Sequence, residues 1–425
     1  ILDTDFETLD FLSHVTEIQG TFAIANNSEL TSLKGTENIQ SIGEDFYLGG
    51  ATKLSSPNEI KNLTSVGADF IIHGNTNLTS LGGFENLTSI GGDLIVSSNT
   101  GLTSLAGLFS LKHIGATIYI AENTGLTSLS GLINITPSIH ALTIVHNSGL
   151  KSLIGLENII SAQGLFLEGN DDLVSLAGLE NLESIETLLF LVRNHQLTNL
   201  SELSNLESIG EHSNISENDQ LVSLTGLENI QTIGDNLEIS RNKSLISLSG
   251  LDNLLSIGGN LLIYQNEKLT SLHGLDSLQA VNGNTYIAGN NNLTTISGLE
   301  SVQHIGGSLA LSANIDLISL LGIENISYIG GNLNISGSDN ITALFGLENI
   351  EIISGDVNLF GNKSLTSLFG LESIQSIEGT LSIEENGALT SMQGLGNVQH
   401  IGEVFLRSNS DLLSITELTS LTRVD

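Results

Sequence analysis

The chain has 425 residues, of which 12 are Lys or Arg and 47 are Asp or Glu, so its formal net charge is −35. We expect neither nucleic acid nor an anionic membrane surface as a partner, since both bind cationic patches. There is no cysteine, which removes disulfides, thiol catalysis and zinc–thiolate sites. No stretch approaches the roughly 18 consecutive apolar residues of a membrane-spanning helix, so we expect no direct membrane insertion.

One repeated unit runs through the whole chain. The copy at residues 78–101 reads LTSLGGFENLTSIGGDLIVSSNTG; counted from Leu78 as position 1, the template is L-T-S-L-x-G-L-E-N-L-x-S-I-G-G-x-L-x-I-x-x-N-x-x. The step is 24 residues, except in two 23-residue coils that begin at Leu150 and Leu389. Coils begin at residues 6, 30, 54, 78, 102, 126, 150, 173, 197, 221, 245, 269, 293, 317, 341, 365, 389 and 412. This fixed period predicts a single continuous solenoid over residues 1–425.

Within each unit, positions 17 and 19 are apolar and flank a variable position 18, as Leu94 and Val96 flank Ile95. This alternation predicts a short strand with one buried face in every coil. Apolar residues also recur at positions 1, 4, 7, 10 and 13, a three-residue spacing that favours an extended or 3₁₀ path over an α-helix. Stacking such strands in parallel gives continuous aliphatic columns, so we predict a solenoid dominated by β-structure.

Two further columns hold the turns, a column being the residues at one position of successive coils. Position 22 is nearly always Asn, as at Asn75 and Asn99, and position 6 is usually Gly, as at Gly83. Asn tolerates left-handed backbone and bonds to nearby main chain, so a stacked Asn column can satisfy turn amides. A recurring Gly indicates positive φ or close approach between coils. We interpret both columns as structural.

Acidic residues form two columns. We interpret the column at position 8 as a solvated ridge, because a glycosidase needs two carboxylates in unequal environments. The shorter run at position 16, Asp45, Asp69 and Asp93, is a candidate Ca²⁺ site, since calcium prefers oxygen ligands; plain solvated carboxylates are the alternative. No other cofactor is expected. The position-8 column consists of Glu37, Glu85, Glu157, Glu180, Glu228, Asp252, Asp276, Glu300, Glu324, Glu348 and Glu372.

No catalytic pattern stands out. The ten histidines fall at differing coil positions without metal-ligand spacing, and G-x-S-x-G, H-E-x-x-H and phosphate-loop motifs are absent. Thr and Ser at positions 2 and 3, as in Thr79–Ser80, form hydroxyl columns, as in an ice-binding solenoid. Adjacent residues of a strand face opposite sides, however, so these are not one flat Thr face. We interpret the Ser column as bonding to the turn, and we expect no enzyme.

Position 18 is the most informative column, because it faces outward and should be polar if the sheet only met water. Seven successive coils instead carry the column-18 row, which is Tyr47, Ile71, Ile95, Tyr119, Thr143, Phe166 and Phe190. Asn214 and Glu238 break the row; Leu262 and Tyr286 resume it, with Tyr264 beside them at position 20. Contiguous exposed apolar surface marks interaction sites, so we predict a ligand- or partner-binding stripe here. Cross-strand stacking, or cover by a neighbouring domain, is the alternative.

The segment I-G-G-x-L-x-I-x-x-N-x-x-L-x-S-L-x-G-L resembles the leucine-rich-repeat superfamily, most closely the receptor L-domain type, from about Phe6 to Val424. Two residues rather than one separate Asn99 from Leu102, and the cysteine-rich modules that flank receptor L-domains are absent. The resemblance implies a right-handed, strand-lined solenoid of about 17 coils, like a parallel β-helix or leucine-rich-repeat fold. It also implies extracellular recognition, as in bacterial-type surface repeat proteins, and brings no catalytic residue.

These observations favour a secreted or cell-surface recognition or adhesion module that binds a protein or glycan along the strand face between Tyr47 and Phe190. The alternative is a structural element that associates end to end into a fibre or surface layer, since both ends stop in mid-coil and uncapped ends invite stacking. Ice binding is a third hypothesis. An enzyme would need a groove with two converging carboxylates.

Overall fold

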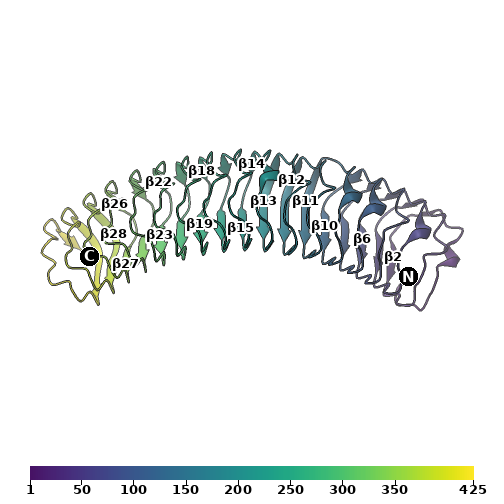
Figure 1. Cartoon of the computed structure of the whole chain (residues 1–425), viewed down its shortest axis with the longest axis horizontal. Coiled ribbons are helices and arrows are strands. Elements are labelled where there is room, and N and C mark those ends of the chain that lie inside the picture. Colours follow the sequence, from purple (N-terminus) through teal and green to yellow (C-terminus); the bar gives the residue numbers. More distant parts are fainter. The chain divides into compact units, whose positions relative to one another are not determined.

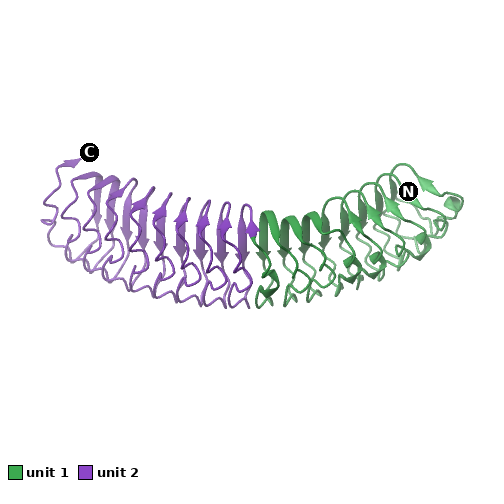
Figure 2. Ribbon diagram, turned by 90° about the horizontal axis from the view of Figure 1, so that it is seen from above, with its two compact units in different colours: residues 1–207 green, residues 208–425 purple.

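The computed structural model describes residues 1–425 as two compact units, Ile1–Glu207 (unit 1) and Ser208–Asp425 (unit 2) (Figure 2). In each unit the chain winds in coils of about 24 residues whose strands stack in parallel (Figure 1). Helix is confined to five 3₁₀ segments of three residues, all in unit 1. The predicted, nearly all-β parallel solenoid of about 17 coils is confirmed. The single continuous solenoid over residues 1–425 stays a prediction.

Most coils of unit 1 carry a two-residue strand and then a four-residue strand, which fuse into one longer strand in three successive coils. The strands are β1 (Glu17–Ile18), β2 (Phe22–Ala25), β3 (Ser41–Ile42), β4 (Phe46–Gly49), β5 (Ser65–Val66), β6 (Phe70–His73), β7 (Ser89–Ile90), β8 (Leu94–Ser97), β9 (His113–Ile114), β10 (Ile118–Ala121), β11 (Ser138–Val145), β12 (Ser161–Glu168) and β13 (Ser184–Val192). The 3₁₀ segments are η1 (Asp10–Leu12), η2 (Asn58–Ile60), η3 (Ala106–Leu108), η4 (Ser130–Leu132) and η5 (Ser201–Leu203).

Unit 2 repeats this pattern, with fused strands only near its end. Its strands are β14 (Ser208–Ile209), β15 (Ser213–Ser216), β16 (Thr232–Ile233), β17 (Leu237–Ser240), β18 (Ser256–Ile257), β19 (Leu261–Tyr264), β20 (Ala280–Val281), β21 (Thr285–Ala288), β22 (His304–Ile305), β23 (Leu309–Ser312), β24 (Tyr328–Ile329), β25 (Leu333–Ser336), β26 (Ile352–Ile353), β27 (Val357–Phe360), β28 (Ser376–Glu384), β29 (His400–Arg407) and β30 (Arg423–Val424).

The apolar columns form the core of each coil. In the coil that begins at Leu78, the side chains at positions 1, 4, 7, 10, 13, 17 and 19 are all fully buried. Unit 1 adds a small aromatic cluster, in which the rings of Phe46, Phe70 and Phe84 have centroids 4.8–5.5 Å apart. Burial of this surface supplies the main favourable free energy of folding. The same columns in unit 2 are mostly aliphatic, for example Leu333 and Ile335, with buried Ser213 and Thr285 as exceptions at position 17.

The Asn column has the predicted structural role. Buried Asn99 accepts a hydrogen bond from the backbone N–H of Asn75 (3.0 Å) and donates its amide to the carbonyl of Ile72 (2.9 Å). Each Asn thus satisfies backbone groups in coils below it, which would otherwise be buried without partners. The left-handed residue of this turn is not the Asn but the residue before it, such as Ser98 (φ 57°).

The Gly and acidic columns act together. Gly83 has a φ of 106°, and its N–H donates to Oε2 of Glu85 at 2.7 Å; the same Gly-to-acid bond occurs at every acidic residue of the position-8 column. The interpretation of this column as a plain solvated ridge is therefore wrong. Each carboxylate holds a turn in which a left-handed Gly would otherwise lack an acceptor.

Several coils of unit 1 without an acid at position 8 fold the same segment differently. Phe109 and Ile133 occupy that position in two coils of unit 1, and there Gly107 and Gly131 lie inside the 3₁₀ segments η3 and η4. The side-chain acceptor is missing in these coils. In the coil that begins at Leu102 the backbone adds an i→i+3 bond, from Phe109 N–H to Ala106 O (3.3 Å).

The Ser column bonds to the turn as predicted, since the backbone N–H of Gly82 donates to the hydroxyl of Ser80 at 2.9 Å. The Thr column links coils: the hydroxyl of Thr79 donates to the carbonyl of Ser55 at 3.3 Å, and Thr127 bonds to Thr103 at 3.1 Å. The Thr hydroxyls therefore form hydrogen bonds that hold neighbouring coils together.

Candidate partner-binding surface

The structure brings the column-18 row together on the outer side of unit 1. Its residues come from β4, β6, β8, β10, β11, β12 and β13, and each stands directly opposite the next in the parallel register. Six inter-strand steps of ~4.8 Å give the row a length of about 29 Å. The pairs in order are Tyr47–Ile71, Ile71–Ile95, Ile95–Tyr119, Tyr119–Thr143, Thr143–Phe166 and Phe166–Phe190.

The row faces outward but is only partly exposed. Phe46 and Leu48, which flank Tyr47 along β4, are fully buried, whereas Tyr47 itself is half-buried. Tyr119 is the most exposed member, with 37% of its surface accessible. Neighbouring members cover one another from strand to strand, so the row is a low apolar ridge rather than a set of free side chains.

Two aromatic rings of the row lie flat along their own strands. A Cβ added at Gly49 would lie 2.6 Å from a ring carbon of Tyr47, and one at Gly164 would lie 2.6 Å from a ring carbon of Phe166. Phe166 also stacks on Phe190, with centroids 5.4 Å apart and planes 15° from parallel. Cross-strand stacking therefore contributes at this end, and the resulting surface is flat and ordered.

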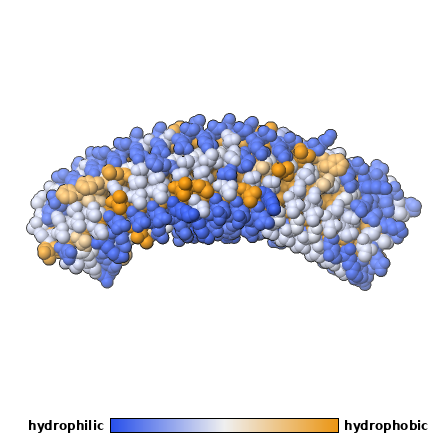
Figure 3. Space-filling view, viewed as in Figure 1, coloured by the Kyte–Doolittle hydropathy of each residue, from blue (hydrophilic) through white to orange (hydrophobic).

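The margins of the row are polar. His73 bonds to Ser97 (2.9 Å) on one side, and Arg193 pairs with Glu168 (3.0 Å) beside the Phe166–Phe190 stack. On the face shown in Figure 3, hydrophobic residues form separate patches among hydrophilic ones. An apolar centre with a polar margin is the usual composition of a protein interface.

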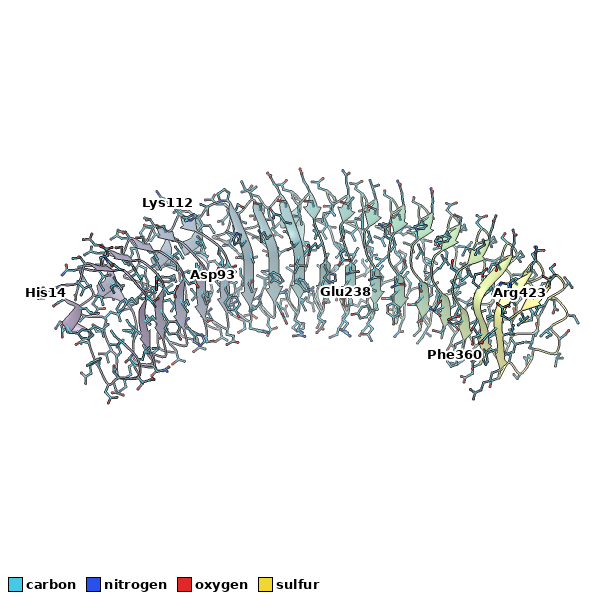
Figure 4. The ribbon with its side chains drawn as sticks, turned by 180° about the vertical axis from the view of Figure 1, so that it is seen from behind. His14, Asp93, Lys112, Glu238, Phe360 and Arg423 are labelled. Carbon is cyan, nitrogen blue, oxygen red and sulfur yellow. The ribbon has the colours of Figure 1, made fainter.

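Asp45, Asp69 and Asp93 border the row at position 16 and have a structural use. Oδ1 of Asp45 accepts the backbone N–H of Asp69 (3.1 Å), and Oδ1 of Asp69 accepts that of Asp93 (2.8 Å). Asp93, labelled in Figure 4, does the same for Thr117 (2.8 Å). No group of three or more His, Asp or Glu residues suited to a metal ion occurs in the structure, and the calcium assignment stays a prediction.

In unit 2 the predicted stripe residues form a different kind of surface. Leu262 is half-buried and stands opposite Tyr286, while the rings of Tyr264 and Tyr286 meet at an angle of 62° with centroids 6.1 Å apart. The guanidinium of Arg241 lies 5.4 Å from the centre of the Tyr264 ring. The Tyr264 hydroxyl donates to the carboxylate of Glu238, labelled in Figure 4. Burial raises the pKa of Tyr264 and the Glu238 carboxylate raises it further, so this hydroxyl stays protonated at neutral pH.

Beside these tyrosines lies a groove that sequence reasoning missed. One hollow of about 520 Å³ is adjoined by a smaller one of about 180 Å³, and both are lined by Gln265, Gly289 and Ala313. The sequence signal was the small pair at positions 20 and 21 in successive coils, Ala288–Gly289 and Ser312–Ala313. The larger hollow is lined by Arg241, Lys243, Gln265, Glu267, Gly289, Asn291, Ala313 and Ile315.

Apart from His73 at the margin of the row, several histidines occur in other parts of the coils. His304 stacks on Tyr328 with the planes 3° from parallel, His400 lies 3.2 Å from Asp425, and His113 and His140 line a shallow hollow of about 260 Å³. Two carboxylates, Glu351 and Glu372, line a separate hollow of about 410 Å³ in unit 2, where Glu372 accepts a hydrogen bond from the backbone N–H of Gly370 (2.8 Å). The structure also contains no helix long and apolar enough to cross a membrane.

Comparison with known proteins identifies the repeat. Residues 2–125 match the model of the BspA type leucine rich repeat region, in six copies. Over residues 2–125 the coils are similar to BspA type leucine-rich repeats. The structure titled "Crystal structure of TLR13-ssRNA13 complex" is similar at 16% sequence identity and a TM-score of 0.33, over 89% of this chain and 56% of that chain. This chain thus spans just over half of that one, and a likeness so distant says nothing about ligands. No curated protein matches the chain.

Leucine-rich repeats are binding scaffolds for proteins and other ligands, and they are typically not enzymes. This chain is a repeat protein, and its residues 2–125 match such a repeat. The receptor L-domain subtype, a secreted or surface location and a role in adhesion stay predictions at this point.

Proposed function

We propose that this chain is a secreted or cell-surface recognition module that binds a protein partner along the column-18 row. The observation that carries this proposal is the row itself: seven successive strands place mostly apolar, in-register side chains on the outer face of a chain with a net charge of −35. A sheet that met only water would have polar residues at those positions. Four of the seven row residues lie within the matched leucine-rich repeats of residues 2–125.

The shape of the row favours a protein over a small ligand. Small molecules bind in concave sites that surround them, whereas the rings of Tyr47 and Phe166 lie flat over Gly49 and Gly164 and present no cavity. Tyr is common among the residues that dominate the binding energy of protein interfaces. Because the rings are already ordered by their neighbours, binding costs little side-chain entropy.

The charge around the row indicates which partners would associate fastest. Asp45, Asp69 and Asp93 lie along one side, and Glu122 lies close by, bonded to Ser98 at 2.7 Å. Opposite charges across an interface raise the association rate and disfavour wrong partners. We therefore propose a partner with an apolar centre flanked by Lys or Arg, and an association rate that falls as salt is added.

The test is the double variant Tyr47→Ser/Tyr119→Ser, measured for binding of the labelled full chain to intact cells and to arrayed extracellular proteins. Removing two aromatic contacts, one at the end of the row and one in its middle, should weaken binding roughly 30-fold or more, by the usual cost of losing interface hot spots. Tyr328→Ser is the matched control, since Tyr328 is 40% exposed in unit 2 and far from column 18 in its coil. Unchanged binding by a folded double variant would remove the row as the interface.

A further inference from the structure

The groove of unit 2 has its own architecture, independent of the column-18 row. Its floor is made by position 21, where Gly289 (φ 64°) and Ala313 (φ 53°) are left-handed and leave almost no side-chain bulk. From Arg241 to Ala313 the larger hollow crosses four coils, which is three steps of ~4.8 Å or about 14 Å. The groove is therefore elongated across the coils, with a bare floor in two coils and Arg241 and Gln265 at the same position in the other two.

The walls of the groove differ from each other. On the strand side stand Tyr264 and Tyr286, the latter 39% exposed, and both line the smaller hollow. On the opposite side Asn291 and Ile315 line the larger hollow, with Ile315 46% exposed. A ligand lying on the floor would thus meet aromatic ring surface on one side and an amide and an aliphatic side chain on the other.

The positive charges at one end of the groove are already neutralised. Arg241 donates to Gln265 (2.8 Å), lies 3.6 Å from Glu217 and covers the ring of Tyr264. Lys243 bonds to Asp219 (3.0 Å), and that hydrogen bond raises the pKa of the lysine. Glu267 adds a further negative charge to the lining. An anionic ligand would have to displace these partners, so the groove favours an uncharged one.

We propose that this groove binds a short segment of a neutral oligosaccharide, laid across the coils with about one sugar ring per coil step. The C–H faces of a pyranose pack on aromatic rings, here those of Tyr264 and Tyr286, and its hydroxyls bond to amides and hydroxyls, here those of Gln265, Asn291 and Ser312. A hexopyranose is about as long as the coil step, so successive rings lie over successive coils, and the bare floor is at Gly289 and Ala313. The site is distinct from the proposed protein interface in both residues and ligand.

The experiment is an array of neutral, sialylated and sulfated oligosaccharides together with Lys-rich peptides, probed with the full chain and followed by calorimetry on the best neutral sugar. Ser312→Phe fills the groove at position 20, where the coil that contains Phe360 already accommodates a phenylalanine. It should lower the affinity for the sugar at least tenfold. Tyr286→Ala should do the same by removing one aromatic wall.

Tyr328→Ala is the matched control, because it removes an equally exposed tyrosine from another column of unit 2. The double variant Tyr47→Ser/Tyr119→Ser should retain full sugar binding, which separates this proposal from the protein interface. Preference for sulfated sugars or for basic peptides would overturn the proposal, as would a complete lack of binding to neutral sugars. Equal sugar affinity of the wild type, Ser312→Phe and Tyr286→Ala would also overturn it.

Discussion

The strand faces of the two units are built on the same coil and differ in their outward residues. In unit 1 column 18 is apolar from Tyr47 to Phe190, apart from Thr143. In unit 2 the same column holds Asn214 and Glu238 in β15 and β17, then Leu262 and Tyr286 in β19 and β21, and then Asn334 and other polar or small residues in β25 and the strands around it. Most inward positions are aliphatic in both units, and most coils of both units have a buried Asn at position 22. The buried and turn columns therefore determine the fold of the coil. The outward columns can vary without changing the fold, so their residues can form binding surfaces.

Column 16 shows the same freedom in a structural role. In unit 1 the carboxylates of Asp45, Asp69 and Asp93 each accept a hydrogen bond from a backbone N–H of the next coil. Unit 2 does so with amides and a hydroxyl: the backbone N–H of Asn260 bonds to Asn236 (2.8 Å) and that of Asn332 to Ser308 (2.9 Å). Any short side chain with an acceptor oxygen serves here, so the negative charge of unit 1 is not needed to stack the coils.

The largest expected effect is in the buried Asn column. Asn99→Ala removes the acceptor for Asn75 and the donor to Ile72, and Asn266→Ala removes the equivalent bonds in unit 2. Each change should lower the free energy of unfolding by about 3 kcal/mol, because buried backbone groups lose their partners. Urea denaturation of the full chain, or hydrogen exchange of the affected coils, measures this. If the free energy of unfolding fell strongly for one of these variants and not for the other, the Asn column would not have the same structural role in the two units.

The exposed Asn at position 9 is the control for that prediction. Asn86 donates one hydrogen bond to the carbonyl of Lys61 (2.8 Å), so Asn86→Ala should cost only about 1 kcal/mol. If Asn86→Ala and Asn99→Ala lowered the free energy of unfolding by the same amount, burial of the Asn side chain would not explain its contribution to stability.

The sequence predicts most of the coil and little of its side-chain chemistry. Period and polarity were enough to place Leu78 in the core and Asn99 in a buried column, and to align Tyr47 with Tyr119 on one face. They could not show that Glu85 accepts a hydrogen bond from Gly83, because that depends on which way an exposed carboxylate turns. Sequence reasoning missed the groove at Gly289 because the groove forms where successive coils have small side chains. No single residue in the sequence indicates such a hollow.

A smaller effect is expected at the Gly-to-acid turn. Glu85→Ala in unit 1 and Glu324→Ala in unit 2 remove the acceptors for Gly83 and Gly322, and each should cost about 1 kcal/mol of unfolding free energy. Glu183→Ala is the control, since Glu183 is an exposed carboxylate outside the position-8 column. If all three variants unfold at the same urea concentration, these carboxylates do not hold the turns.

The smallest change in stability is expected when an Asp at position 16 of unit 1 is replaced by Asn, which occurs at that position in unit 2. Asp69→Asn keeps the acceptor oxygen for the backbone N–H of Asp93, so stability should change by less than about 0.5 kcal/mol. Thermal melts with calcium and with a chelator should coincide for the wild type and the variant. A calcium-dependent rise in Tm that Asp69→Asn abolishes would instead establish a calcium site, since a ligand that binds only the folded state stabilises it.

Whether the column-18 row is the surface that partners contact can be measured by photo-crosslinking. A benzophenone side chain placed at residue 119, or at residue 328 as the control, is irradiated while the full chain is bound to cells. The account predicts a crosslinked protein from residue 119, sensitive to added salt, and none from residue 328. Crosslinking from residue 328 but not from residue 119 would contradict it, because the partner would then contact a surface other than the row.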